Sequence, residues 1–351
     1  MYTSSKHKEL PMIVRLGLSM IIVAMMASSL QATEDMSKWL RPAEVPQPKD
    51  NKLTPERIEL GKFLYFDVRL SSSEKISCAT CHHPKQGWSD LEPTPKAVGH
   101  EGAVGPRNSP TVLNSAYQSR QFWDGRVKTL EQQALGPIEA DVEMNMDLNV
   151  LIPKLNAIKG YVDLFEKAYP GEGLTKKTLA KAIASFERTV VSTISPFDKY
   201  AMGKKDAISN KAKKGFELFK GKAHCIDCHD GFNFTDGSFH NIGLRDGELQ
   251  GKDLGRYLTK RRAAWYGVMK TPTLRDAEKS APYFHDGSAG TLHEVAHVCG
   301  NGGRFKHNVK NKSTYIEDRK LTRPELSQLV SFIESLTGPD MKLKIPTKFP
   351  Q

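Results

Sequence analysis

Hydrophobic residues recur at intervals of three and four positions in several stretches of the chain, which is the spacing of an amphipathic helix. Strict alternation of apolar and polar residues is scarce, so little β-sheet is expected. The pattern therefore predicts a mainly α fold whose helices are joined by long loops. The apolar stripes are Ile58, Leu60, Phe63 and Leu64; Leu151, Leu155, Ile158, Val162 and Phe165; Leu179, Ile183, Phe186 and Val190; Phe216 and Phe219; and Leu326, Leu329, Val330, Ile333 and Leu336.

Helix-start signals and loop composition refine this pattern. Thr54 predicts the start of the first helix, and Pro324 predicts the first turn of the last one. Two segments, 81–123 and 230–256, are rich in Gly, Pro, Asn, Asp and Ser and are expected to be loops. Loops of that length within a compact domain usually serve a functional site. The helical pattern breaks at 194–203, which makes this segment the best candidate for a domain boundary.

The N-terminus has the layout of a targeting segment. Basic residues precede an apolar run at 16–30, and small residues up to Ala32 offer cleavage positions, so residues 1–32 are predicted to be a secretory signal peptide. The run of about 15 residues is shorter than the ~20 that span a bilayer. We therefore expect no stable membrane span after cleavage; an uncleaved anchor is the alternative. Outside the cytoplasm, a pair of cysteines is either bridged or covalently occupied.

Composition and charge exclude several classes of protein. The chain has 351 residues, 38% hydrophobic and 26% charged, which is enough for two ordinary globular domains and excludes both a mini-protein and a disordered tail. Its net charge of +11 raises the question of nucleic-acid binding. The basic residues are spread along the chain and belong to no nucleic-acid motif, so we interpret them as a solvated surface and expect no nucleic-acid partner.

The five cysteines carry the strongest chemical signal. Four of them form two C-x-x-C-H motifs, in which two thiols add to the vinyl groups of one porphyrin and the adjacent histidine binds the iron. A zinc knuckle or a thioredoxin-like redox pair is the alternative for a single copy. Two intact copies in an exported chain predict two covalently bound c-type haems. The motifs are Cys78, Cys81 and His82, then Cys225, Cys228 and His229, and Cys299 is left over.

The two halves of the chain are weakly alike. Each has a helix with an internal glycine, Gly61 or Gly215, followed by a short loop and a C-x-x-C-H motif. A duplicated unit explains this most simply, and it predicts an N-terminal haem domain over 45–198 and a C-terminal haem domain over 204–345.

The sequence around the motifs resembles the bacterial di-haem cytochrome c peroxidase family, which includes MauG-like relatives. The resemblance covers nearly the whole mature chain, and it implies two cytochrome c-like haem domains in the periplasm. It also implies reduction of hydrogen peroxide to water with electrons from a small redox protein, a cytochrome c or a cupredoxin. Dimerisation is an expectation from the family alone. The segments that carry the resemblance are LGKFLYFDVRLSSSEKISCATCH (60–82), GWSD (87–90), NSPTVLNSAYQSRQFWDGR (108–126), FKGKAHCIDCH (219–229), KTPTLRD (270–276) and APYFHDG (281–287).

The resemblance implies roles for four residues near the first haem. His100 matches the histidine on the distal side of that haem, carried by a mobile loop; a surface histidine is the alternative. Glu143 matches the carboxylate that moves a proton between the peroxide oxygens, with Gln133 beside it. Trp123 matches the tryptophan between the two haems; ordinary core packing is its alternative.

The resemblance also implies a calcium ion between the domains. Asn108, Ser280 and Pro282 match the family positions that bind it. Amide and carbonyl oxygens suit this hard cation, and water completes its coordination shell.

The second haem is where the chain departs from the family. Peroxidases have a methionine ligand about 14 residues after the histidine of APYFHDG, MauG-like relatives have tyrosine, and here the position is Cys299. At 100° per residue, Leu292, Val295, Ala296 and Cys299 share one helix face, so we expect Cys299 to point inward as an iron ligand. A buried free cysteine is the alternative.

The same predicted helix contains H-E-x-x-H, a zinc-protease motif. The helical wheel places His293 and His297 away from the apolar face, and the motif lies inside the haem-binding segment. We therefore do not interpret it as a zinc site.

Two further functions stay open at this point. A MauG-like enzyme would oxidise a partner protein through a high-valent state, which an anionic sixth ligand at Cys299 favours and His100 disfavours. A non-enzymatic electron-transfer or redox-sensing protein would keep both irons six-coordinate.

Overall fold

The computed structural model describes residues 1, 35–92, 94–245, 253–307 and 309–351. The predicted signal peptide, 1–32, lies outside the described residues except for Met1. The chain divides into two compact units, Met1–Ser37 and Lys38–Gln351, and the fold discussed below is that of the second unit. Among the described residues, no helix is long and apolar enough to cross a membrane.

The second unit is mainly helical, as the sequence predicts, and its β structure in the described ranges is one short antiparallel ribbon of β1 and β2 together with isolated antiparallel bridges. The predicted loops 81–123 and 230–256 hold short turns of 3-10 helix and β1 where they are described. The α-helices are α2 (Pro55–Phe66), α3 (Cys78–Cys81), α4 (Leu130–Glu139), α5 (Leu148–Asn156), α6 (Lys159–Ala168), α7 (Lys176–Glu187), α8 (Pro196–Ala201), α9 (Asn210–Lys220), α10 (Tyr257–Lys260), α11 (Leu292–Gly300) and α12 (Arg323–Glu334). The strands are β1 (Phe239–His240) and β2 (Met269–Lys270), and the 3-10 helices are η1 (Ser37–Trp39), η2 (Val68–Leu70), η3 (Pro84–Gln86), η4 (His100–Gly102), η5 (Ser115–Tyr117), η6 (Cys225–Asp227), η7 (Ala263–Trp265) and η8 (Ala277–Lys279).

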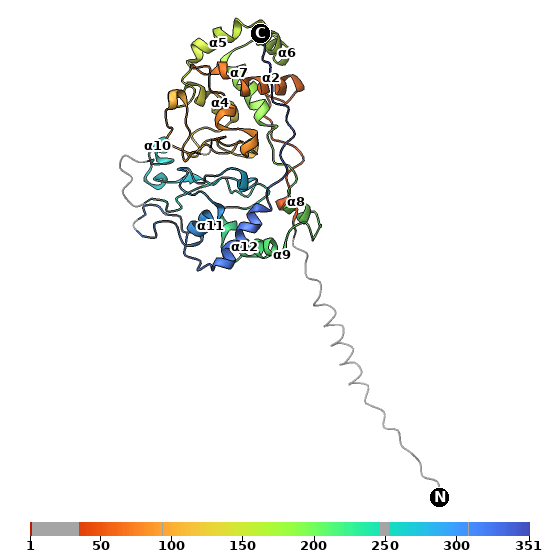
Figure 1. The fold of residues 1–351 in the computed structure, drawn as a ribbon, viewed down its shortest axis with the longest axis vertical. Helices are drawn as coiled ribbons and strands as arrows, with labels where there is room; N and C mark the ends of the chain where they lie inside the picture. The colour runs from red at the N-terminus through yellow and green to blue at the C-terminus, as the bar shows by residue number, and fades with distance from the viewer. Residues whose placement is uncertain (2–34, 93, 246–252, 308) are drawn as a thin grey trace. The chain divides into compact units, whose positions relative to one another are not determined.

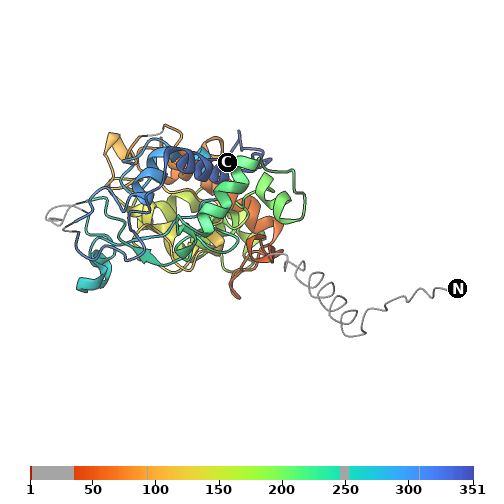
Figure 2. The same cartoon turned by 90° about the horizontal axis from the view of Figure 1, so that it is seen from below.

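The longer helices pack in two groups. In the first, α7 packs against α2 and α4, and α6 packs against α2 and α5. In the second, α12 packs against α9 and α11. Figures 1 and 2 both show α9 and α12 side by side. Each group buries its own apolar stripes: Phe165 and Leu179 are fully buried in the first, and Phe216 and Phe332 are buried in the second.

The internal glycine of each half lies at a close helix crossing. A Cβ atom on Gly61 of α2 would collide with the carbonyl group of Ala182 in α7. A Cβ atom on Gly215 of α9 would collide in the same way with the carbonyl group of Gln328 in α12. Glycine is required where two backbones approach this closely. The two halves therefore share a packing device as well as a motif, which supports the predicted duplication, while the domain limits 45–198 and 204–345 stay a prediction.

We expect Gly215→Ala to lower the free energy of unfolding by about 1–3 kcal/mol, because the added methyl group forces α9 and α12 apart. Lys214→Ala, at the adjacent exposed position of α9, should change the stability by less than about 0.5 kcal/mol. Thermal unfolding of the haem-loaded variants, followed by circular dichroism, measures both effects. Equal melting temperatures for the two variants would contradict the close crossing.

The end of the chain returns to the first group of helices, and Figure 1 shows the C-terminus beside α5 and α6. The backbone N–H of Gly160 in α6 donates to the Gln351 carbonyl at 2.7 Å. Phe349 packs edge-on against Phe63 of α2, with ring centroids 6.4 Å apart. Residues that follow α12 therefore help to cover the N-terminal half.

Two predicted features differ from the structure. The stripe from Leu151 to Phe165 is two helices, because α5 ends at Asn156 and α6 begins at Lys159. The segment 194–203, expected to break the helical pattern, contains α8. Ser195 caps α8 by accepting from the Asp198 N–H at 3.1 Å, and the Asp198 carboxylate accepts from the Ser195 N–H at 2.8 Å. Reciprocal capping stabilises a helix too short to show an apolar stripe.

Candidate functional site

The first C-x-x-C-H motif lies on a single helical turn. Cys78 and Cys81 begin and end α3, and His82 follows directly. Burial lowers the pKa of His82 to about 4, so its imidazole is neutral, which is the form that binds a metal. Its Nδ1 atom is buried without a hydrogen-bond partner. The Tyr65 hydroxyl donates to the His82 carbonyl at 2.9 Å and fixes the backbone behind the motif.

In the second motif, a hydrogen bond made by the imidazole ring fixes the orientation of the histidine. His229 Nδ1 lies 2.7 Å from the Phe234 carbonyl oxygen, which can only accept, so Nδ1 carries the proton and donates. This hydrogen bond leaves the Nε2 lone pair free to bind a metal and sets the plane of the ring. Burial also lowers the pKa of His229. Cys225 begins η6, and Cys228 follows directly after its last residue.

A cavity of about 260 Å³ opens beside the second motif. Cys225, Cys228 and His229 line it together with residues of α11. Much of the remaining wall is apolar, as a porphyrin requires. The apolar lining includes Phe219, Ile242, Leu244, Met269, Leu292, Val295, Ala296, Leu329 and Ile333.

Cys299 lies on the α11 wall of this cavity with the apolar residues that share its helix face, as the helical wheel predicts. Burial raises the pKa of its thiol to about 12, so the free thiol stays protonated. A metal ion reverses this preference, because a coordinating thiol is deprotonated. The structure thus places Cys299 where a ligand would stand, and its coordination of iron stays a prediction.

The H-E-x-x-H residues of α11 face away from the cavity. His293 and His297 are exposed. The Glu294 carboxylate accepts from the backbone N–H of Thr291 at 3.0 Å, and its own N–H donates to the Thr291 hydroxyl at 3.1 Å. The glutamate of the motif is therefore a helix cap, which is a structural use of the residue.

The structure brings His100 and Glu143 together beside the first motif. The His100 backbone N–H donates to the Glu143 carbonyl at 2.8 Å, and His100 Nδ1 lies 3.2 Å from the Ser72 hydroxyl. Gly99 makes this contact close, because a Cβ atom there would collide with the Val142 carbonyl. From the sequence, the glycines here are expected to make the loop mobile. The structure shows in addition that Gly99 has no room for a side chain.

Glu143 is half-buried near the first cysteine pair. Burial raises the pKa of its carboxyl group, and the charge of Arg126 opposes that shift. Glu143 also acts electrostatically on Cys78 and Cys81, so it lies close to the attachment site. Gln133 is half-buried on α4, and among the described residues its side chain makes no hydrogen bond to Glu143. The proximity of these two side chains stays a prediction.

Trp123 connects the two halves. Its indole Nε1–H donates to the Asn108 carbonyl at 2.9 Å, and its own carbonyl accepts from the Lys270 N–H at 2.7 Å. The ring lies edge-on to His285 with centroids 6.4 Å apart, and Trp123 lines the cavity of the second motif. This position suits a residue between two haems.

The three predicted calcium ligands lie along the same cavity wall. Asn108, Ser280 and Pro282 all line it, although they come from opposite halves of the sequence. The Asn108 N–H donates to the His285 carbonyl at 2.8 Å, which joins the two segments. Calcium binding at these residues stays a prediction.

Comparison with known proteins identifies the family. The family model described as di-haem cytochrome c peroxidase matches residues 55–206. The methylamine utilization protein MauG of Methylorubrum extorquens is 41% identical over 311 residues, which are 88% of this chain and 86% of the relative. The chain belongs to the di-haem cytochrome c peroxidase family. The cytochrome c551 peroxidase of Pseudomonas aeruginosa is 36% identical over 312 residues, 87% of this chain and 85% of that one.

A solved structure agrees with this assignment. The crystal structure of a MauG-like protein associated with microbial copper homeostasis superposes with a TM-score of 0.79 at 28% identity and covers 87% of this chain and 95% of its own. The family membership makes the protein an oxidoreductase with haem as its cofactor.

The residues present fit two covalently attached haems. All five cysteines lie in the described ranges and are free thiols. The two cysteines of each C-x-x-C-H motif are therefore not joined in a disulfide, although they are close in sequence. The cavity beside Cys225 and Cys228 offers an apolar wall, and the His229 ring is already oriented for iron by its bond to Phe234. Each C-x-x-C-H motif therefore supplies the thiols and the axial nitrogen that a c-type haem needs.

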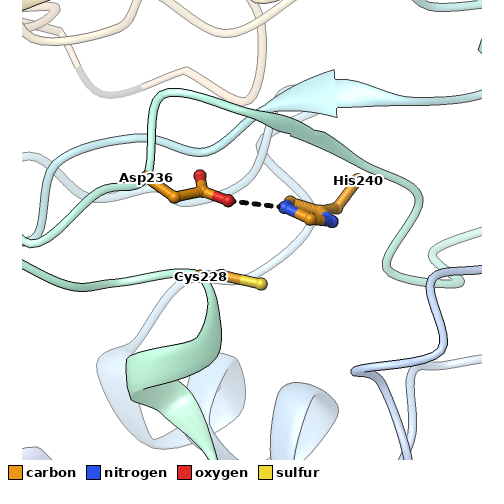
Figure 3. Close-up of side chains that lie close together, drawn as sticks. All are labelled: Cys228, Asp236 and His240. Carbon is orange, nitrogen blue, oxygen red and sulfur yellow. Dashed lines mark hydrogen bonds and ion pairs between the residues drawn. The ribbon is translucent and has the colours of Figure 1, made fainter.

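The structure adds a pair that sequence analysis missed. Asp236 Oδ2 lies 2.9 Å from His240 Nε2, and ligand atoms of Cys228, Asp236 and His240 all lie within 4.8 Å of one another (Figure 3). Hydrogen bonding to Asp236 raises the pKa of His240 to about 9, so the imidazole is a cation. Cys228 belongs to the second haem motif, so we interpret Asp236 and His240 as an ion pair beside that motif. No motif in the sequence marks these residues.

Proposed function

We propose that this protein is a periplasmic di-haem peroxidase that reduces hydrogen peroxide to water with electrons from a small redox protein, a cytochrome c or a cupredoxin. The observation that carries the proposal is the position of half-buried Glu143, whose backbone carbonyl accepts from the His100 N–H and whose carboxyl acts electrostatically on the cysteines of the first C-x-x-C-H motif. When bound, the haems supply iron that binds peroxide and transfers electrons.

Glu143 would move a proton from one peroxide oxygen to the other. Cleavage of the O–O bond needs a group that first accepts a proton and then donates it. Burial raises the pKa of Glu143, which brings proton uptake and release by this carboxyl closer to neutral pH. His100 would close the distal side of the first haem in one state and leave it in another.

The path for electrons would run from the second haem through Trp123. Two hydrogen bonds hold this residue: its indole N–H donates to the Asn108 carbonyl, and its own carbonyl accepts from the Lys270 N–H, so the partners come from both halves of the chain. They hold the indole at the wall of the cavity beside the second motif, which supports a role for this ring in electron transfer.

A MauG-like activity is the second candidate, in which the oxidising equivalents of peroxide pass to a residue of a partner protein. Cys299 favours it, because a thiolate is anionic like the tyrosinate of MauG-like relatives, whereas the peroxidase methionine is neutral. The identity of 41% to the MauG of Methylorubrum extorquens also favours it.

The deciding experiment is steady-state peroxide consumption by the pre-reduced holoenzyme with a reduced small donor protein. We expect turnover in the range of typical enzymes, about 1–1,000 s⁻¹. Spectral change with peroxide but no turnover would favour the MauG-like candidate. No spectral change in the reduced enzyme would contradict both, and would leave an electron-transfer or redox-sensing protein.

Several features belong to the same proposal. Residues 1–32 would direct export and be removed, residues 45–198 and 204–345 would form the two haem domains, and Asn108, Ser280 and Pro282 would bind one calcium ion between them. A homodimer would be the assembled form.

A further inference from the structure

The charged residues that line the cavity of the second motif are not equally paired. Arg245 pairs with Asp286 at 3.3 Å, and Asp253 accepts from Arg107 at 2.8 Å. Lys270 also lines the cavity and is only 8% exposed. Among the residues that the structure describes, its ammonium group makes no ion pair or hydrogen bond. A buried ammonium without an anion is costly, so the wall leaves one positive charge to be neutralised.

The backbone fixes where Lys270 lies. It ends β2, where it pairs with Phe239 of β1, and its N–H donates to the Trp123 carbonyl at 2.7 Å. Both contacts are made by the backbone, so the side chain is left available. The lysine is thus held between the residue proposed to connect the haems and the cavity that would receive the second haem.

The acid that acts on Lys270 already has a partner. Asp236 acts electrostatically on Lys270, but its carboxylate already binds the His240 cation at 2.9 Å, as Figure 3 shows. One carboxylate facing two cations leaves a net charge of +1 on the group of Asp236, His240 and Lys270. Burial lowers the pKa of Lys270 to about 8, although the charge of Asp236 acts in the opposite direction, which is the response of an ammonium group removed from water.

We propose that Lys270 binds a propionate carboxylate of the second haem. A c-type haem carries two propionates, and an apolar cavity offers them little else that is positively charged and unpaired. The ion pair would orient the porphyrin and cancel one negative charge near the iron. The inference rests on the haem that the family membership provides, and it holds whether the enzyme is a peroxidase or a MauG-like oxidase.

The test compares Lys270→Met with Lys270→Arg and with Lys260→Met, an exposed lysine of α10. The readouts are haem content per chain and the midpoint potential of the second haem, followed optically in a redox titration. Removing the cation leaves a propionate charge unbalanced, which disfavours the added electron. We expect Lys270→Met to weaken reduction of the second haem about tenfold, or 59 mV for one electron.

Lys270→Arg should recover most of this potential, because it keeps the charge, and Lys260→Met should match the wild type. Lys270→Gln, which keeps the length of the side chain without its charge, serves if the methionine variant does not accumulate. Loss of the second haem in the neutral variants but not in Lys270→Arg would also support the ion pair. Two bound haems with unchanged potential in a neutral variant, or equal defects in Lys270→Arg, would overturn it.

Discussion

Replacing Glu143 with glutamine should lower peroxide turnover by about two to four orders of magnitude, the usual contribution of a positioned acid–base group. The amide keeps the size of the side chain but cannot carry the proton between the peroxide oxygens. The backbone hydrogen bond from His100 to the residue 143 carbonyl does not depend on the side chain, so the loop should stay in place. Steady-state peroxide consumption by the pre-reduced holoenzyme measures the effect.

Glu139→Gln is the matched control. Glu139 is close in sequence and exposed at the end of α4, so the same chemical change there should leave turnover within about twofold of the wild type, as expected for a surface substitution. Equal losses in the two variants would remove Glu143 from the reaction. Unchanged haem spectra in both variants would show that the heme sites are intact.

The pH dependence of turnover gives the same assignment a second signature. The ionised carboxylate accepts the first proton, so activity falls as the pH drops through the pKa of Glu143. Because burial raises that pKa above its ordinary value, the acid limb should lie at higher pH than for an exposed glutamate. The limb should disappear in Glu143→Gln, since the amide does not titrate.

Replacing Cys299 with methionine should raise the midpoint potential of the second haem by on the order of 0.1 V or more, given the range that axial ligands cover. A thiolate donates charge to the iron and stabilises its oxidised state, whereas a thioether favours the reduced state. The position on the cavity wall beside Cys225 and Cys228 suits either side chain. The electronic and paramagnetic resonance spectra should change together with the potential.

Val298→Met is the control for this substitution. Val298 precedes Cys299 on α11 but is not among the residues that line the cavity, so its methionine should leave the spectra and the potential of the second haem unchanged. If Cys299→Met also leaves them unchanged, Cys299 is a spectator thiol and the comparison with the family's methionine and tyrosine ligands fails.

The sequence by itself determined the features that depend on local chemistry. The two C-x-x-C-H motifs need only their own residues to attach a porphyrin, and the family comparison agrees that haem is the cofactor. The main helices follow from apolar spacing, and Thr54 and Pro324 mark helix starts, because capping and first-turn preferences act within a few residues. Helix α8 was missed because a capped helix of 6 residues carries no periodic stripe.

Only the tertiary structure decided how distant residues meet. It brought the backbone of His100 onto Glu143 and placed Cys299 on the wall of the cavity that His229 also lines. It also showed Lys270 buried beside an acid that His240 already occupies. Burial and pairing depend on every segment that packs around a side chain, so no local pattern reports them. The sequence motifs predict the haems, and the tertiary packing determines which charged residues and which candidate ligands surround them.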